Sequence, residues 1–130
     1  MTLLLDTTIL INLERKKKNI IERISRLLES DPVPASITFI NYFEFIHGLH
    51  KKNPKNREEA IIFIEKFHCL QTTKNTAKIL SNLKYKYEKL GKVFSLTDLI
   101  IASQAIENNM TLVTNDKQFE TIAELKKVIL

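Results

Sequence analysis

Four acidic residues lie at positions where the surrounding sequence predicts burial. Asp6 ends the run Leu3-Leu4-Leu5, Glu44 lies within Tyr42-Phe43-Glu44-Phe45-Ile46, Asp98 precedes Leu99-Ile100-Ile101-Ala102, and Asp116 follows Leu112-Val113-Thr114-Asn115. A carboxylate that leaves water loses much of its hydration energy unless a cation or strong hydrogen-bond donors replace the solvent. Four such residues in one small chain, called here the four acids, therefore suggest a shared metal ion.

Length and composition are those of one globular domain. The chain has 130 residues, of which 44% are hydrophobic, so we expect residues 1–130 to form a single domain with a sizeable core. Apolar runs are short and Met1 is followed at once by a strand-like segment, so we expect no signal peptide, no membrane span and a cytoplasmic location. The single cysteine, Cys69, has no partner for an intramolecular disulfide, and we interpret it as a core residue.

Positive charge is clustered, whereas several acids lie in apolar contexts. The formal net charge is +5, and the basic groups are Arg15 to Lys18, then Lys51, Lys52, Lys55 and Arg57, then Lys84, Lys86, Lys89 and Lys92. Such clusters attract a polyanion, although a solvated helix surface explains any one of them as well. We assign Tyr87 to a helical core face with Leu80, Leu83 and Leu90 rather than to base stacking.

The expected elements alternate between strands and helices. Strands are predicted over residues 2–6, 35–40, 69–72, 110–114 and 127–130. Helices are predicted over 7–13, 20–30, 41–50, 56–67 and 99–108, and a long helix is predicted from either Thr73 or Asn75 to residue 90. This alternation predicts an α/β fold with a mainly parallel sheet of four to five strands and helices on both faces.

Turn and capping residues mark the expected boundaries. Asn41-x-x-Glu44, Asn56-x-x-Glu59 and Ser95-x-x-Asp98 have capping spacing, which places Asn41 at an N-cap and Glu44 in the first helical turn. Thr7-Thr8 would cap the first helix and Gly91 would end the long one. We expect a turn at Asp31-Pro32, which contains the only Asp outside the four acids.

The four acids all map to one edge of the predicted sheet. Asp6, Glu44 and Asp116 follow expected strands or lie in the next turn, and Asp98 lies in the first turn of a helix. Ligands of open α/β sheets bind at this carboxyl edge. Gathered carboxylates repel one another unless divalent cations neutralise them, and oxygen ligands without His or Cys suit Mg²⁺ or Mn²⁺.

Four blocks of sequence occur in a characteristic order. They are Asp6-Thr7-Thr8-Ile9-Leu10-Ile11, Asn41-x-x-Glu44-Phe45-x-x-Gly48, Leu96-x-Asp98-x-x-Ile101-Ala102 and Leu112-Val113-Thr114-Asn115-Asp116-x-x-Phe119. Together they resemble the successive motifs of PIN domains, and of VapC toxins in particular, over nearly the whole chain. The resemblance implies an acidic quartet of Asp6, Glu44, Asp98 and Asp116 and a pocket hydroxyl from Thr114. Thr8 and Ser95 depart from the Asn or Ser and the Gly that such toxins often carry there.

The same resemblance implies an activity and partners. It implies a cytoplasmic, Mg²⁺- or Mn²⁺-dependent endoribonuclease that hydrolyses RNA phosphodiester bonds, a homodimer, and a VapB-like antitoxin. Our hypothesis is that Asp6, Asp98 and Asp116 hold one or two ions that activate water for in-line attack, while Glu44 holds the second ion or that water. Apolar positions in 9–13 and 41–50 could provide a surface for the antitoxin, although core packing explains them equally well.

Other functions fit parts of the sequence. The main alternative is a non-catalytic or degenerate PIN-like module that binds RNA or metal without cleavage. Glu44-x-x-His47 and Glu65-x-x-His68 have di-iron spacing, but the chain begins with a strand and these helices are short. A haloacid-dehalogenase-like domain needs a second Asp at the position of Thr8. We assign no catalytic role to the three histidines.

The four acids also have a purely structural interpretation. Glu44 and Asp98 could act only as charges at helix starts, where they are favourable. Asp6 and Asp116 could act only as acceptors for turn amides. It is less plausible that all four acids have separate structural roles at the same sheet edge than that they share one function.

Overall fold

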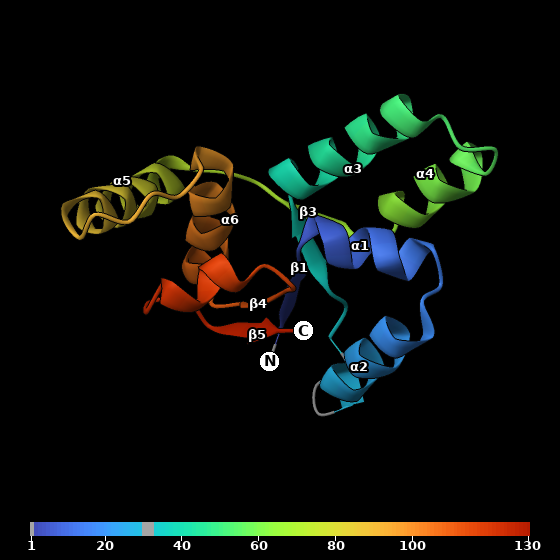
Figure 1. Ribbon diagram of the computed structural model, residues 1–130, viewed down its shortest axis with the longest axis horizontal. Helices are drawn as coiled ribbons and strands as arrows, with labels where there is room; N and C mark the ends of the chain where they lie inside the picture. The colour runs from blue at the N-terminus through green and yellow to red at the C-terminus, as the bar shows by residue number, and fades with distance from the viewer. Residues whose placement is uncertain (1, 30–32) are drawn as a thin grey trace.

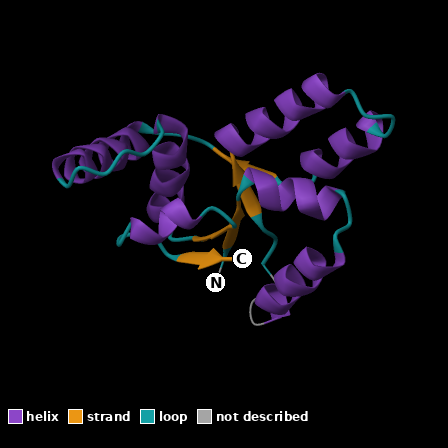
Figure 2. Ribbon diagram, viewed as in Figure 1, coloured by secondary structure: helices purple, strands orange, loops and turns teal. Residues whose placement is uncertain are grey.

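The centre of the molecule is a five-stranded sheet in which every strand pair is parallel (Figure 1, Figure 2). The computed structural model describes residues 2–29 and 33–130. The strand order is β3-β2-β1-β4-β5. The strands are β1 (Leu3–Leu5), β2 (Ser36–Thr38), β3 (His68–Leu70), β4 (Thr111–Thr114) and β5 (Lys127–Ile129). The predicted parallel sheet is confirmed, with β5 as an edge strand.

Helices cover both faces of this sheet. Figure 1 shows α1 to α4 on one side and α5 with α6 on the other. The helices are α1 (Thr7–Glu14), α2 (Lys18–Glu29), α3 (Phe39–Lys52), α4 (Arg57–Glu65), α5 (Lys74–Lys89) and α6 (Leu96–Glu107), with a short 3₁₀ helix η1 (Lys117–Thr121) before β5. The expected α/β/α layering is therefore confirmed.

Continuous apolar strands produce two separate cores. Successive side chains of a strand point to opposite faces of the sheet. A strand that is covered by helices on both faces must therefore carry apolar side chains at every position. Leu3 and Leu5 pack with Ile9 and Phe45 under α1 to α4. Leu4 belongs instead to the cluster under α5 and α6. The run Leu3-Leu4-Leu5 thus joins both cores and fixes the position of the residue that follows it.

The order of the strands creates a switch point next to β1. The chain passes from β1 outward to β2 and β3, and then returns across the sheet to β4 on the other side of β1. The carboxyl ends of β1 and β4 therefore face a crevice in which connecting loops diverge, which is the usual ligand site of such sheets.

Two of the expected helix boundaries are confirmed by their capping bonds. The Ser95 hydroxyl accepts the Asp98 N–H at 3.1 Å and caps α6. Thr73 caps α5, and Gly91 adopts φ +73° just after this helix, a conformation that glycine accommodates without strain.

The expected start of α3 is wrong by three residues. Thr38 is the N-cap, and Asn41 is the third helical residue of a reciprocal capping box. The helix starts early because Thr38 Oγ1 accepts the Asn41 N–H while Asn41 Oδ1 accepts the Thr38 N–H. As a result β2 ends at Thr38, and Glu44 lies in the second turn of α3.

Other local expectations also need correction. Asp6, rather than Thr7 or Thr8, caps α1, and Asn56 precedes α4 without a side-chain capping bond. Tyr87 is buried as expected, but Leu90 is 60% exposed. Cys69 is only partly buried. Ser30 and the Asp31-Pro32 turn lie outside the described residues.

Within the described residues, no helix has the length and apolarity needed to cross a bilayer.

Candidate active site

Asp6 lies at the centre of a hydrogen-bond network at the carboxyl edge of the sheet. Its Oδ1 accepts the Thr7 N–H at 2.9 Å and a proton from Asn41 Nδ2 at 3.3 Å. Its Oδ2 accepts the Thr114 hydroxyl at 2.6 Å. Strand register brings these groups together, since Leu5 pairs with Val113 and the Asp6 N–H donates to the Val113 carbonyl at 3.0 Å.

Asp116 is joined to Asp6 through Thr114. The Thr114 hydroxyl oxygen that donates to Asp6 also accepts the Asp116 N–H at 3.0 Å. Asp116 Oδ1 accepts the Gln118 N–H at 3.0 Å and so caps η1. One buried hydroxyl therefore sets the relative positions of two of the four acids.

Asp98 lies within the electrostatic field of both neighbours. Partial burial raises the pKa of Asp98, the negative charges of Asp116 and Asp6 raise it further, and a hydrogen bond with Ser95 opposes the change. The first turn of α6 thus brings a third carboxylate near the pair on β1 and β4.

Glu44 reaches the site through an intermediate side chain. Its carboxylate is exposed, and its Oε1 accepts the Thr7 hydroxyl at 2.6 Å. The Thr7 oxygen in turn accepts a proton from Asn41 Nδ2 at 3.1 Å. Although Glu44 lies one turn further along α3 than expected, it remains connected to Asp6 through Thr7 and Asn41.

The structure brings all five predicted site residues to one edge: Thr114 links Asp6 with Asp116, Thr7 bonds Glu44, and Asp98 lies within the field of Asp6 and Asp116. In residues 2–29 and 33–130, no three Asp, Glu, His or Cys side chains form a ready-made metal shell. No Lys, Arg or His in these ranges forms a salt bridge with the four acids. The donors are all oxygen and their charge is uncompensated by protein cations, which fits a hard divalent ion such as Mg²⁺ or Mn²⁺. The catalytic role of these residues stays a prediction.

Sequence reasoning missed two members of the network. The sequence predicts Thr7 only as a helix cap and Asn41 only as an N-cap. The signal that could have found them is Thr38-x-x-Asn41, which has the spacing of a capping box but ends in an amide rather than the usual Glu or Gln.

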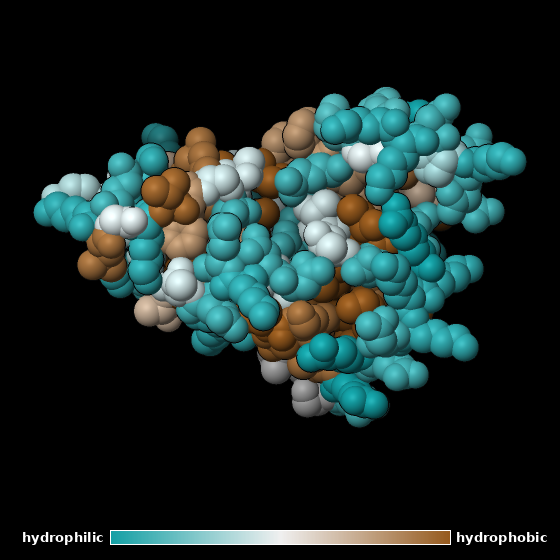
Figure 3. Space-filling view, viewed as in Figure 1, coloured by the Kyte–Doolittle hydropathy of each residue, from teal (hydrophilic) through white to brown (hydrophobic). Residues whose placement is uncertain are grey.

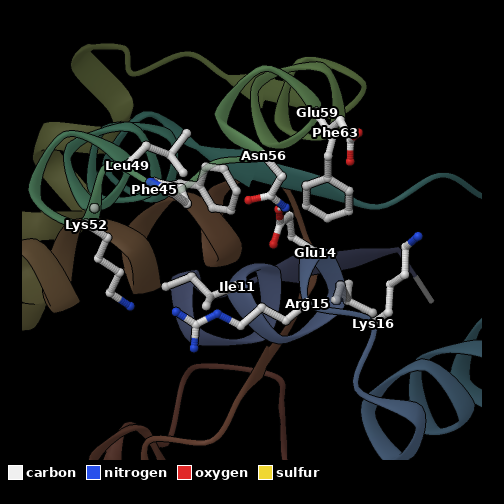
Figure 4. A pocket seen from close by; sticks show the side chains of 13 residues that line it. Ile11, Glu14, Arg15, Lys16, Phe45, Leu49, Lys52, Asn56, Glu59 and Phe63 are labelled. Atoms are coloured by element: carbon white, nitrogen blue, oxygen red, sulfur yellow. The ribbon is translucent and has the colours of Figure 1, made fainter.

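A groove of about 590 Å³ lies between α1, α3 and α4 (Figure 4). Its apolar lining includes Ile11, Phe45, Leu49 and Phe63, and none of the four acids lines it. Figure 3 shows hydrophobic side chains in this hollow, bordered by hydrophilic ones. The groove is therefore separate from the acidic network, although α1 and α3 contribute to both.

A family model described as PIN domain matches residues 3–125. The chain belongs to the PIN-domain family. This PIN domain is 25% identical to ribonuclease VapC2 of Rickettsia felis over 127 residues, which is 96% of the chain and 95% of the relative.

Solved structures agree with this assignment. VapBC2 from Rickettsia felis, bound to a DNA fragment from its promoter, matches with a TM-score of 0.84 and 26% identity, covering 100% of this PIN domain and 99% of the matched chain. VapBC-1 from nontypeable Haemophilus influenzae matches with a TM-score of 0.80 and 27% identity, covering 99% and 98%. The fold of this PIN domain is thus that of these two structures.

Proposed function

We propose that this PIN domain is a divalent-metal-dependent endoribonuclease that hydrolyses RNA phosphodiester bonds in the cytoplasm as the toxin of a VapBC-type pair. The observation that carries the proposal is the Asp6–Thr114–Asp116 linkage at the switch point, with Asp98 in the same field. The relative named ribonuclease VapC2 supports the reaction class.

The residues of the chain have distinct tasks in this reaction. Three donors hold Asp6 in one orientation, and Thr114 keeps it aligned with Asp116. Asp6, Asp98 and Asp116 would hold Mg²⁺ or Mn²⁺, which when bound supplies an activated water and neutralises charge on the phosphodiester. Glu44 Oε1 is engaged by Thr7, so Glu44 Oε2 would be the atom that holds a second ion or the attacking water.

A cleavage assay tests the proposal. Purified protein is mixed with total RNA in Mg²⁺ or Mn²⁺, with EDTA as the metal-free condition. We expect cleavage that EDTA abolishes and that Asp6→Asn reduces by at least about a hundredfold, because the substitution removes charge with little change of volume. Glu58→Gln, an exposed acid in the first turn of α4, is the matched control and should keep full activity.

Two results would reject this function. A fully active Asp6→Asn protein would reject the site. Absence of cleavage by a wild-type protein that still binds RNA or Mn²⁺ would favour the non-catalytic alternative.

We propose a VapB-like antitoxin as the occupant of the groove between α1, α3 and α4. Its apolar lining and the cations Arg15, Lys16 and Lys52 at its edge suit an amphipathic segment with acidic flanks (Figure 4). Both structural relatives named above are VapBC structures, which supports a partner of this kind.

Co-expression with the adjacent small reading frame tests this partner. Leu49→Glu should keep ribonuclease activity and lose inhibition by the antitoxin, because it puts a charge on the groove wall. Ile62→Glu, on the exposed side of α4, should keep both properties. Unchanged inhibition of Leu49→Glu would reject the groove as the binding surface.

We also propose a homodimer that covers the exposed aromatic side chains of α3. Phe39 and Phe43 are 61% and 53% exposed, and Leu96 at the start of the adjacent helix α6 is also exposed. Apolar groups of this size favour burial against a second copy. Light scattering should show a dimer that Phe43→Asp dissociates and Tyr85→Asp, an exposed aromatic on α5, does not.

A further inference from the structure

The amide side chain of Asn41 is buried in the first turn of α3. We infer that Asn41 and Thr7 form a positioning relay that orients Asp6 and holds Glu44 at the site, a role that rests on the proposed ribonuclease function. Neither residue is one of the four acids, and both occupy first turns of helices that begin at the sheet edge. The relay makes the start of α3 part of the catalytic apparatus.

Every hydrogen-bonding position of the Asn41 amide is used. Asn41 is 0% exposed. Its Oδ1 accepts the Thr38 N–H at 3.0 Å and the Thr38 hydroxyl at 2.7 Å. Its Nδ2 donates to Asp6 Oδ1 at 3.3 Å and to Thr7 Oγ1 at 3.1 Å. Because a backbone N–H can only donate, the Thr38 amide fixes which end of the Asn41 side chain is oxygen.

The Thr7 hydroxyl transmits this orientation to Glu44. It accepts from Asn41 and donates to Glu44 Oε1 at 2.6 Å, so three side chains form one directional chain of hydrogen bonds. Each bond in such a chain polarises the next, and the final bond ends on a carboxylate. Glu44 is otherwise an exposed side chain in the second turn of α3, so this bond selects one rotamer out of several.

The relay also determines how Asp6 can bind a cation. A carboxylate has about four acceptor positions. Asp6 Oδ1 accepts from Thr7 N and Asn41 Nδ2, and Asp6 Oδ2 accepts from Thr114. One position remains, on Oδ2, so Asp6 is prepared to bind a metal through a single oxygen atom.

Position 41 requires an amide rather than an acid. A carboxylate there could still accept both bonds from Thr38 and thus keep the cap of α3. It could not donate to Asp6 or Thr7, and its charge would repel Asp6 at the present 3.3 Å separation. Asn41→Asp therefore removes the donor half of the network and leaves the capping half.

The first test compares Asn41→Asp with wild type. We expect kcat for RNA cleavage to fall by at least about tenfold with little change of KM, because the reacting groups lose their orientation while the RNA surface is unchanged. Circular dichroism checks that the variant is folded. A folded Asn41→Asp protein with wild-type kcat overturns the relay.

The second test uses Thr7, since its variants do not alter the cap of α3. Thr7→Val should lower kcat by about tenfold, and Thr7→Ser should restore it by replacing the hydroxyl. Thr8→Val is the matched control, because Thr8 is exposed on the same helix turn and none of the described residues bonds to its hydroxyl. Failure of Thr7→Ser to rescue activity contradicts the relay.

A double-mutant cycle then identifies the target of the Thr7 bond. In a Glu44→Gln background, Thr7→Val should cause little further loss, because its effect on the wild type passes mainly through Glu44. Fully multiplicative losses would show that Thr7 acts independently of Glu44 and would overturn the second half of the relay.

Mn²⁺ binding without RNA separates this inference from the proposed function. Calorimetry should show weaker Mn²⁺ binding by Thr7→Val, by about threefold or more, and unchanged binding by Thr8→Val. If the wild type binds Mn²⁺ but does not cleave RNA, the proposed ribonuclease function is wrong. The relay is then tested only by comparing the Mn²⁺ affinities of the wild type and the two variants. A wild-type chain that neither cleaves RNA nor binds Mn²⁺ overturns both.

Discussion

Thr114 donates a hydrogen bond to Asp6 Oδ2 over 2.6 Å, although the two residues are 108 positions apart in the chain. The same hydroxyl oxygen accepts the Asp116 N–H. Thr114 is fully buried, and a hydrogen bond to a carboxylate is stronger away from water. Thr114 is thus the structural link between the acids that follow β1 and β4.

This link predicts opposite results for two substitutions of Thr114. Thr114→Val keeps the shape of the side chain but removes the hydroxyl, so we expect kcat for RNA cleavage to fall by about a hundredfold. Loss of a buried partner of a carboxylate should also cost about 1–3 kcal/mol of unfolding free energy, measured with urea. Thr114→Ser keeps the hydroxyl and should retain most activity; equal loss in both variants would indicate a packing defect instead.

The raised pKa of Asp98 predicts that replacing this residue abolishes activity but makes the folded protein more stable. Its pKa is raised by burial and by the charges of Asp116 and Asp6. The folded protein therefore binds a proton more readily than the unfolded chain, and stability falls as pH rises from about 4 through the raised pKa. Asp98→Asn should abolish cleavage yet raise Tm at pH 7 by about 2 °C in metal-free buffer.

The pH dependence of this increase in Tm tests the electrostatic explanation. The Tm difference between Asp98→Asn and wild type should vanish below about pH 4, where the Asp98 carboxyl is protonated in both states. Added Mg²⁺ should stabilise the wild type more than the variant. A variant that is less stable than wild type at pH 7 would contradict the electrostatic argument.

The contribution of Glu107 to the stability of the folded protein should depend on pH in the opposite direction. Burial acts to raise the pKa of Glu107, but hydrogen bonds from Thr76, Thr73 and Asn75 outweigh it and the net direction is downward. The Thr73 bond measures 2.8 Å and ties the start of α5 to the end of α6. A lowered folded pKa contributes stability above the unfolded value of about 4.3, and this contribution is lost as pH falls through the folded pKa.

Glu107→Gln should therefore be less stable than wild type at pH 7 and nearly equal to it at pH 3. Because this carboxylate is largely accessible to solvent, the difference at pH 7 should stay below about 1 kcal/mol in urea unfolding. RNA cleavage should not change, since Glu107 lies at the far end of α6 from Asp98. Glu58→Gln is the control, and a difference that grows towards low pH would contradict the sign.

Lysines of α5 and the next loop predict unequal effects on RNA binding. Lys84 and Lys86 form salt bridges with Glu88 and Glu124 at 3.2 and 3.0 Å. Lys89 and Lys92 form none among the described residues and lie over tyrosine rings at 4.6 and 5.7 Å. The second pair is therefore the better candidate for phosphate contacts.

Replacing Lys89 and Lys92 together with Gln should weaken RNA binding and lower its salt dependence. For single strands, each lost phosphate contact reduces the slope of log K against log salt by about 0.7. The matched control replaces Lys84 and Lys86, whose charges are already paired, and should change the slope less. Fluorescence anisotropy with an uncleavable RNA between 50 and about 200 mM salt measures both. A larger effect of the control pair would reject the assignment.

The sequence by itself determined the layers of the molecule and the candidate acids. Leu3-Leu4-Leu5 and Leu112-Val113 are runs without polar side chains, which requires strands that are covered on both faces of the sheet. The apolar residues between these strands recur with helical spacing, so helices must connect the strands across the sheet. An acid directly after such a strand must reach the carboxyl edge. Local patterns of this kind depend only on neighbours in the chain, and for this reason Asp6, Asp98 and Asp116 could be selected without coordinates, whereas Thr114 was implied only by the resemblance to PIN domains.

Only the tertiary structure decided how these groups are connected. The start of α3 shifted from Asn41 to Thr38 because two capping residues competed, and the reciprocal box of Thr38 with Asn41 satisfied more backbone donors. The contacts of Asn41 with Asp6 and of Thr7 with Glu44 depend on strand register and on the distance between α1 and α3. Hydrogen bonds require atoms within a few tenths of an ångström, and packing across the whole sheet, rather than local sequence, sets such distances.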